Sequence, residues 1–128
     1  MTSRFDHLSL EHAETLLETY AVEIRLRATD VHAKRSTQHF FSKRAKHKGH
    51  LFVATHSLTF DPTDPEAPLL RIPKRSMLAP PHADAAASQP HLELRADTVL
   101  HRYYSHQPFE SATAPTEDGF RLCVMPLH

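Results

Sequence analysis

The chain has 128 residues, of which 40% are hydrophobic and 23% are charged, and this length predicts one domain spanning 1–128 with a modest core. Its single cysteine, Cys123, excludes an internal disulfide framework and favours a cytoplasmic setting. No apolar run approaches the roughly 20 residues of a membrane-spanning helix. The formal net charge is zero, yet residues 31–60 carry six Lys or Arg and no Asp or Glu. Such a concentration of positive charge favours binding to anionic partners.

The N-terminal segment 9–28 supports two interpretations. Apolar residues from Leu10 to Leu17 follow helical spacing, whereas those from Tyr20 to Leu26 alternate with smaller or charged residues, as in a strand. We therefore expect a short helix near 9–18 and a strand near 19–28. The pattern leaves open whether 9–28 is helix or strand.

The rest of the chain alternates between polar loops and short strands. Residues 31–48, the basic loop, show no period, and Pro73 either ends a strand or places it at a sheet edge. Several short strands between turn residues predict a mainly β fold, either a small barrel or a sandwich. We expect strands at 49–55, 58–60, 69–72, 91–104 and 120–125, and mobile loops at 79–90 and 105–118. The residues expected in the core are Gly49, Leu51, Val53, Leu58, Phe60, Leu70, Ile72, Phe120, Leu122 and Val124.

A run of short motifs links the first three of these strands. The run comprises Lys48-Gly49, Ser57 before the second strand, Phe60-Asp61-Pro62, and Leu69-Leu70-Arg71-Ile72-Pro73. In this order, the motifs resemble the N-terminal GRAM/PH-like module of the BEACH-domain protein FAN, the factor associated with neutral sphingomyelinase activation. Arg4-Phe5 and Leu17-Glu18-x-Tyr20 also resemble the opening of that family.

The resemblance implies a PH/GRAM-like split antiparallel barrel. It also implies a role in membrane trafficking or signalling scaffolds, with phosphoinositide binding as the activity proposed for such modules. A helix usually closes the C-terminal end of this barrel, but the chain shows no obvious one, and the BEACH and WD-repeat regions are absent. We therefore expect either a fragment of a larger BEACH protein or a module that acts without those regions.

The basic loop is the strongest candidate site. Its cations can bind anionic lipid headgroups, while Phe40 and Phe41 can insert among lipids or contact a protein partner. The same loop, or a strand edge, would alternatively serve as a protein-interaction or self-association surface without lipid. Nucleic acid is disfavoured because aromatic residues are not interleaved along the strands. The expected lipid- or phosphate-binding residues are Lys34, Arg35, Lys43, Arg44, Lys46 and Lys48.

Other groups of residues are weaker candidates for a functional site than the basic loop. Lys74 and Arg75 would extend the positive patch to a membrane or a partner. His32, His39, His47 and His50 would add charge as the pH falls through about 6.5, but no cysteine stands near them to complete a metal site. We expect no metal and no cofactor. We also expect no catalysis, because the adjacent His56 and Ser57 would face opposite sides of a strand and could not form a catalytic pair.

Overall fold

The computed structural model describes residues 14–27, 46–64, 66–80, 82–84, 91–104, 106–113 and 119–127. Within these ranges the chain forms strands and one 3-10 helix, and every paired strand is antiparallel. The elements are β1 (Leu16–Arg27), β2 (Lys46–Ala54), β3 (Ser57–Pro62), β4 (Leu69–Pro73), η2 (Lys74–Ser76), β5 (His82–Asp84), β6 (His91–Ala96), β7 (Thr98–Arg102), β8 (Glu110–Thr113) and β9 (Phe120–Pro126).

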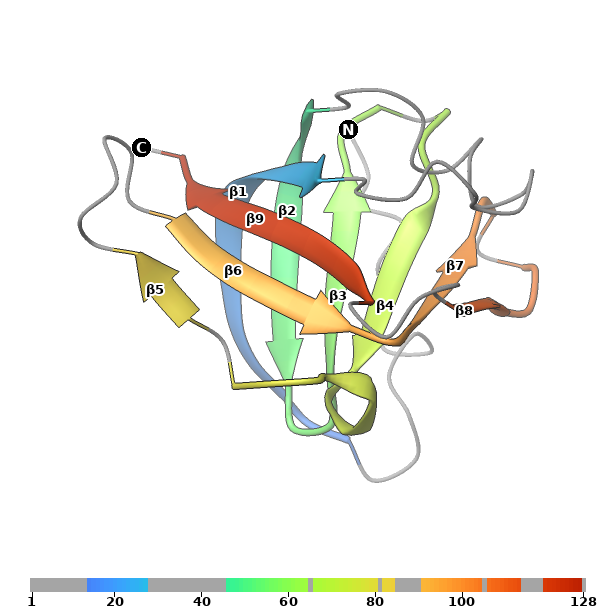
Figure 1. Cartoon of the computed structure of the whole chain (residues 1–128). Coiled ribbons are helices and arrows are strands. Elements are labelled where there is room, and N and C mark those ends of the chain that lie inside the picture. The colour runs from blue at the N-terminus through green and yellow to red at the C-terminus, as the bar shows by residue number, and fades with distance from the viewer. Residues whose placement is uncertain are drawn as a thin grey trace.

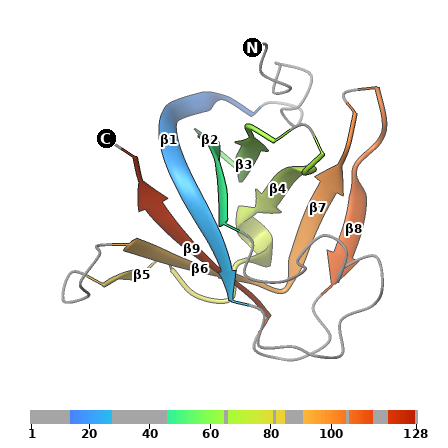
Figure 2. The same ribbon diagram turned by 90° about the horizontal axis from the view of Figure 1, so that it is seen from above.

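These strands form one sheet in the order β5-β6-β9-β1-β2-β3-β4-β7-β8. The long, strongly bent β1 pairs with β2 from Leu16 to Arg25 on one side and with β9 from Val22 to Arg27 on the other, and the sheet curls into a half-barrel (Figures 1 and 2). This architecture confirms the mainly β, PH-like split barrel expected from the sequence.

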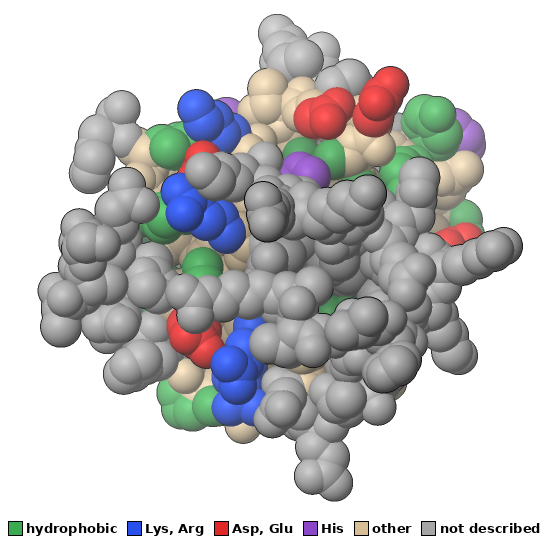
Figure 3. All heavy atoms as spheres, turned by 45° about the horizontal axis from the view of Figure 1, so that its top comes forward, with side chains coloured by type: hydrophobic (Ala, Val, Ile, Leu, Met, Phe, Trp, Pro, Cys, Tyr) green, Lys and Arg blue, Asp and Glu red, His purple; other side chains and the backbone are tan. Residues whose placement is uncertain are grey.

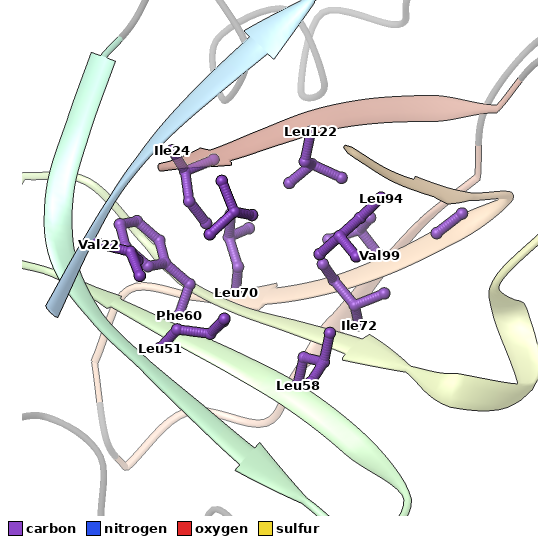
Figure 4. Close-up of a cluster of buried hydrophobic side chains, with 12 residues drawn as sticks. Val22, Ile24, Leu51, Leu58, Phe60, Leu70, Ile72, Leu94, Val99 and Leu122 are labelled. Atoms are coloured by element: carbon purple, nitrogen blue, oxygen red, sulfur yellow. The ribbon is translucent and has the colours of Figure 1, made fainter. Parts of the chain in front are cut away.

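The core lies on the concave face of the curled sheet. Alternate residues from seven strands point into it, as strand pleating requires (Figure 4). Phe60 is only 1% exposed, and Val53 and Phe120 pack against the cluster while remaining partly exposed. The buried cluster contains Val22, Ile24, Leu51, Leu58, Phe60, Leu70, Ile72, Leu94, Ala96, Val99, Leu122 and Val124.

Four boundaries differ from the sequence-based expectations. The helix near 9–18 is wrong from residue 14 onward, because β1 already begins at Leu16, and residues 9–13 lie outside the described part. Pairing with β2 outweighs the helical spacing of Leu16 and Leu17. The basic loop ends earlier than residue 48, since β2 starts at Lys46. The two segments expected as loops, 79–90 and 105–118, each contain a short strand, β5 and β8, at the two edges of the sheet.

Candidate anion-binding site

The basic loop joins β1 to β2. Lys48 is exposed on β2, and Lys46 is the first residue of that strand. Because Arg25 lies opposite Lys46, the two ends of the connection meet at one end of the sheet. Six of the expected contact residues lie outside the described part: Lys34, Arg35, Phe40, Phe41, Lys43 and Arg44.

Three arginine positions form a row across neighbouring strands at this same end. Arg27 in β1 lies opposite Arg121 in β9, and Arg121 lies opposite Arg95 in β6. Since the neighbouring Leu94 and Leu122 are in the core, Arg95 and Arg121 lie on the convex face. We call this row, together with Arg25, Lys46 and Lys48, the basic end of the sheet.

The row concentrates charge of one sign. Like charges placed directly opposite each other destabilise a sheet, and the same arrangement attracts anions. The Nε–H group of Arg121 is buried and donates no hydrogen bond within the part of the chain that the structure describes, and guanidinium groups bind phosphate oxygens well. The row therefore has the composition of an anion site.

Nearby carboxylates partly neutralise the positive charge of the basic end of the sheet. Arg25 donates from Nε to Oε2 of Glu23 at 3.2 Å, and Glu93 precedes Arg95 by two residues on β6. On the face shown in Figure 3, the described Lys and Arg side chains form separate groups with Asp or Glu beside them. On the face in Figure 3 the visible described cations do not make a continuous patch, so the contribution of the connecting segment matters for anion binding there.

Lys74 and Arg75 lie at the opposite end of the β2–β3 hairpin. Both are exposed in η2, and the backbone N–H of Lys74 donates to the carbonyl of His56 at 2.9 Å, beside the hairpin turn. From Lys48 to His56 the chain covers eight residues, or about 25 Å of extended strand. The structure therefore does not bring this pair together with Lys48. Pro73 ends β4, which lies between β3 and β7 and is not an edge strand.

His47 is a weaker cation than its sequence suggests. Burial lowers its pKa below the usual 6.5, and the nearby Asp64 offsets part of that effect. His50 is exposed, while His32 and His39 lie outside the described residues. Among the residues that the structure describes, no three His, Cys, Asp or Glu side chains are grouped as a metal site would require.

The motif residues hold the fold. A Cβ atom at Gly49 would lie 2.2 Å from the carbonyl oxygen of Asp61, so only glycine allows β2 and β3 to approach this closely. Ser57 is fully buried and donates from Oγ to Oε2 of Glu14 at 2.8 Å, whereas His56 is exposed. The two residues face opposite ways, and the serine hydroxyl is directed to a carboxylate.

Arg71, the basic residue of the last motif, also has a packing role. Its guanidinium lies 4.3 Å from the centre of the Phe109 ring, and that of Arg102 lies 4.5 Å from the same centre. Both arginines are buried, and such stacking contributes up to about 2 kcal/mol when desolvated. The sequence did not single out this cluster, because Phe109 lies in a segment expected to be a loop.

The arginine row was also missed. Arg95 and Arg121 of this row each alternate with core residues, which is a usable signal for a solvent-facing position. Their alignment depends on β9 pairing with both β6 and β1, and β1 lies more than ninety residues away along the chain. Sequence spacing contains no information about that register.

The family of the chain follows from comparison with known proteins. The family model described as the FAN protein N-terminal PH domain matches residues 1–103, which is about four fifths of the chain. No curated protein and no solved structure matches the chain. Within the described residues, no helix has the length and apolar character needed to cross a membrane. The match and the antiparallel split barrel agree, and the chain belongs to the family of FAN N-terminal PH domains.

Proposed function

We propose that this PH domain docks on membranes by binding anionic lipid headgroups, phosphoinositides included, at the basic end of the sheet. PH domains are non-catalytic modules, and the chain would act as the peripheral membrane anchor of a trafficking or signalling scaffold. The cytoplasmic leaflet, which is rich in anionic lipids, would supply the charge that it recognises.

One observation carries the proposal. The strand register aligns Arg27, Arg95 and Arg121 at the end of the sheet where Lys46 and Lys48 begin β2. The connection that starts and ends there contributes four further cations, Lys34, Arg35, Lys43 and Arg44, and the aromatic pair Phe40-Phe41.

The magnitudes fit a reversible, salt-sensitive interaction. A Lys or Arg close to an anionic surface contributes about 1 kcal/mol, so four to six cations suffice for peripheral binding. That attraction is screened over about 10 Å at 0.1 M salt and over about 3 Å at 1 M. Insertion of Phe40 and Phe41 would add a component that salt does not weaken.

The test is a co-sedimentation assay with phosphatidylcholine vesicles that contain a phosphatidylinositol phosphate. The double variant Lys46→Glu/Lys48→Glu reverses two charges at the basic end. Its matched control, Lys74→Glu/Arg75→Glu, reverses two charges about 25 Å away along the hairpin. We expect the first variant to lose binding at least tenfold and the control to bind like the parent chain.

Two outcomes would contradict the proposal. Equal losses in both variants would show that net charge, and not this end of the sheet, attracts the vesicles. The alternative function would be favoured if the chain did not bind the vesicles at low ionic strength. It would also be favoured if vesicle binding were equally strong at high ionic strength. In that case the domain is a protein-interaction module that acts through a strand edge or the 31–48 loop without lipid.

A further inference from the structure

Among the described residues, the first half of β1 has a paired strand on one side only. β9 pairs with β1 from Val22 onward, and the last contact is a hydrogen bond from the N–H of Leu127 to the carbonyl of Ala21 at 2.9 Å. The residues of β1 that precede Ala21 pair with β2 and with no other strand of the described part. Toward its own C-terminal end, β9 diverges from β1 (Figure 2). Residues 17–21 thus form what we call the open edge.

The open edge carries apolar side chains. Residues 17–21 are all exposed, with Leu17 at 54% and Tyr20 at 49%. Leu127, at 39%, lies beside Ala21 at the end of the edge. Three of the five large exposed apolar residues in the described part therefore lie along this one line. Exposed apolar strand edges are templates for pairing with another strand.

One of the two end strands of the sheet, β8, differs in chemistry from the open edge. β8 lies at one end of the sheet and exposes Glu110, Ser111 and Thr113, which are charged or hydroxyl-bearing residues. Polar side chains protect a strand edge from association. Association through the sheet should therefore favour β1 over β8.

The backbone of the open edge limits how a partner strand can align. The carbonyl of Ala21 points toward β9, and backbone groups alternate in direction along a strand. Thr19 consequently directs its N–H and C=O away from β2, to the open side. Because the Ala21 carbonyl is already bonded, Thr19 is the natural centre of any new antiparallel pairing.

We propose that the open edge binds the open edge of a second copy of this chain, antiparallel, with the two-fold axis at Thr19. Each Thr19 would exchange two hydrogen bonds with Thr19 of the second copy. Glu18 would then lie opposite Tyr20 of the second copy, and Leu17 opposite Ala21. This contact is isologous, so it closes as a dimer and does not extend into a fibre.

Side-chain chemistry selects this register. Opposite a carboxylate, the Tyr20 hydroxyl can donate a hydrogen bond, and aromatic rings pack well across strands. Shifting the axis by one residue to Glu18 would place two carboxylates directly opposite each other, which is unfavourable. In this register, Glu18 of each copy lies opposite Tyr20 of the other copy. A second copy therefore supplies the matching residues, and this favours it over an unrelated strand.

The edge is short, and the dimer should be weak. The β1–β2 register shifts between Leu16 and Glu18, so Leu17 is an extra residue that interrupts the regular edge at this point. A contact of five residues falls well short of the roughly 800 Å² per partner of a standard interface. We therefore expect dissociation constants in the range of tens to hundreds of micromolar.

Sedimentation velocity of the full chain over a wide concentration range tests the proposal. We expect the mass to rise from 14.6 kDa toward twice that value. Thr19→Pro removes the central N–H, and Tyr20→Glu places a second carboxylate opposite Glu18, so each variant should weaken dimerisation at least tenfold. Ser111→Pro, the matched change on β8, should leave it unaltered. Circular dichroism confirms that each variant is folded.

Other results would overturn the proposal. A mass of 14.6 kDa at every concentration would exclude the dimer. If a folded Tyr20→Glu variant associates like the parent chain, the contact lies elsewhere. The same follows if the Ser111→Pro variant loses the association. Because the measurement uses no lipid and is made at high salt, its outcome is independent of the proposed membrane binding.

Discussion

Replacement of Gly49 by alanine sets two physical effects against each other. In a strand interior, alanine usually stabilises relative to glycine by about 0.5–1 kcal/mol, because glycine loses more backbone entropy on folding. At Gly49, however, the new Cβ would lie 2.2 Å from the carbonyl oxygen of Asp61 and 2.8 Å from Cα of Pro62. Both contacts are with backbone, so relief requires β2 and β3 to separate locally.

The steric effect should dominate. Both contacts are with backbone, so the upper half of the roughly 1–3 kcal/mol cost of overpacking applies. After subtraction of the entropic gain of about 0.5–1 kcal/mol, a net destabilisation of about 1–2.5 kcal/mol is left. Unfolding entropies scale with length, and for a domain of this size 1 kcal/mol corresponds to about 4 °C in Tm. We therefore expect Gly49→Ala to lower Tm by about 4–10 °C.

Thermal unfolding followed by circular dichroism measures this shift, with urea unfolding as a check on the free energy. His50→Ala is the matched control, because His50 is the next residue of β2 and is exposed. Its effect should stay within about 0.5 kcal/mol. If Gly49→Ala were as stable as the parent chain or more stable, the close approach of β2 and β3 would not be present in solution.

Three further changes test the core, a buried hydrogen bond and a titrating group. Phe60→Ala should destabilise the domain by about 3–5 kcal/mol in urea unfolding, since Phe60 is 1% exposed, whereas the exposed Tyr104→Ala should change almost nothing. A loss below about 1 kcal/mol would argue against the core position of Phe60. Ser57→Ala removes a hydrogen bond to the buried Glu14 carboxylate and should cost about 1.5–3 kcal/mol in the same assay; an unchanged midpoint would show that the carboxylate finds another donor. His47 has a lowered pKa, so the unfolded chain binds more protons below the usual 6.5 and stability should fall as the pH drops through that range. His47→Asn should flatten this part of the Tm–pH profile, and an equally steep profile would assign the effect to other groups.

The core was largely predictable because it depends on local alternation. Leu58, Phe60 and Ile72 alternate with polar residues, and strand pleating alone sends them to one face. Val22 and Ile24 were harder, since the preceding residues also fit a helix. Pairing of β1 with both β2 and β9 decides in favour of the strand.

The candidate site was predictable only in part. The concentration of positive charge in 31–48 is a property of composition and was visible at once. The expectation that Lys74 would extend this patch depended on a position in space, and the hydrogen bond from Lys74 to His56 places it at the other end of the hairpin. The sequence did not place Arg121 beside Arg27 and Arg95, because these three residues are neighbours only through the sheet.

The amino-acid order alone determined the class of the fold, most of its buried residues and the family motif from Lys48 to Pro73. These follow from short-range periodicity and turn chemistry, which act between residues near each other in the chain. Tertiary structure alone decided which charges share one end of the molecule, why glycine is required at position 49, and which strand edge stays open. Those features depend on the register between distant strands, because hydrogen bonding in an antiparallel sheet joins residues irrespective of their separation along the chain.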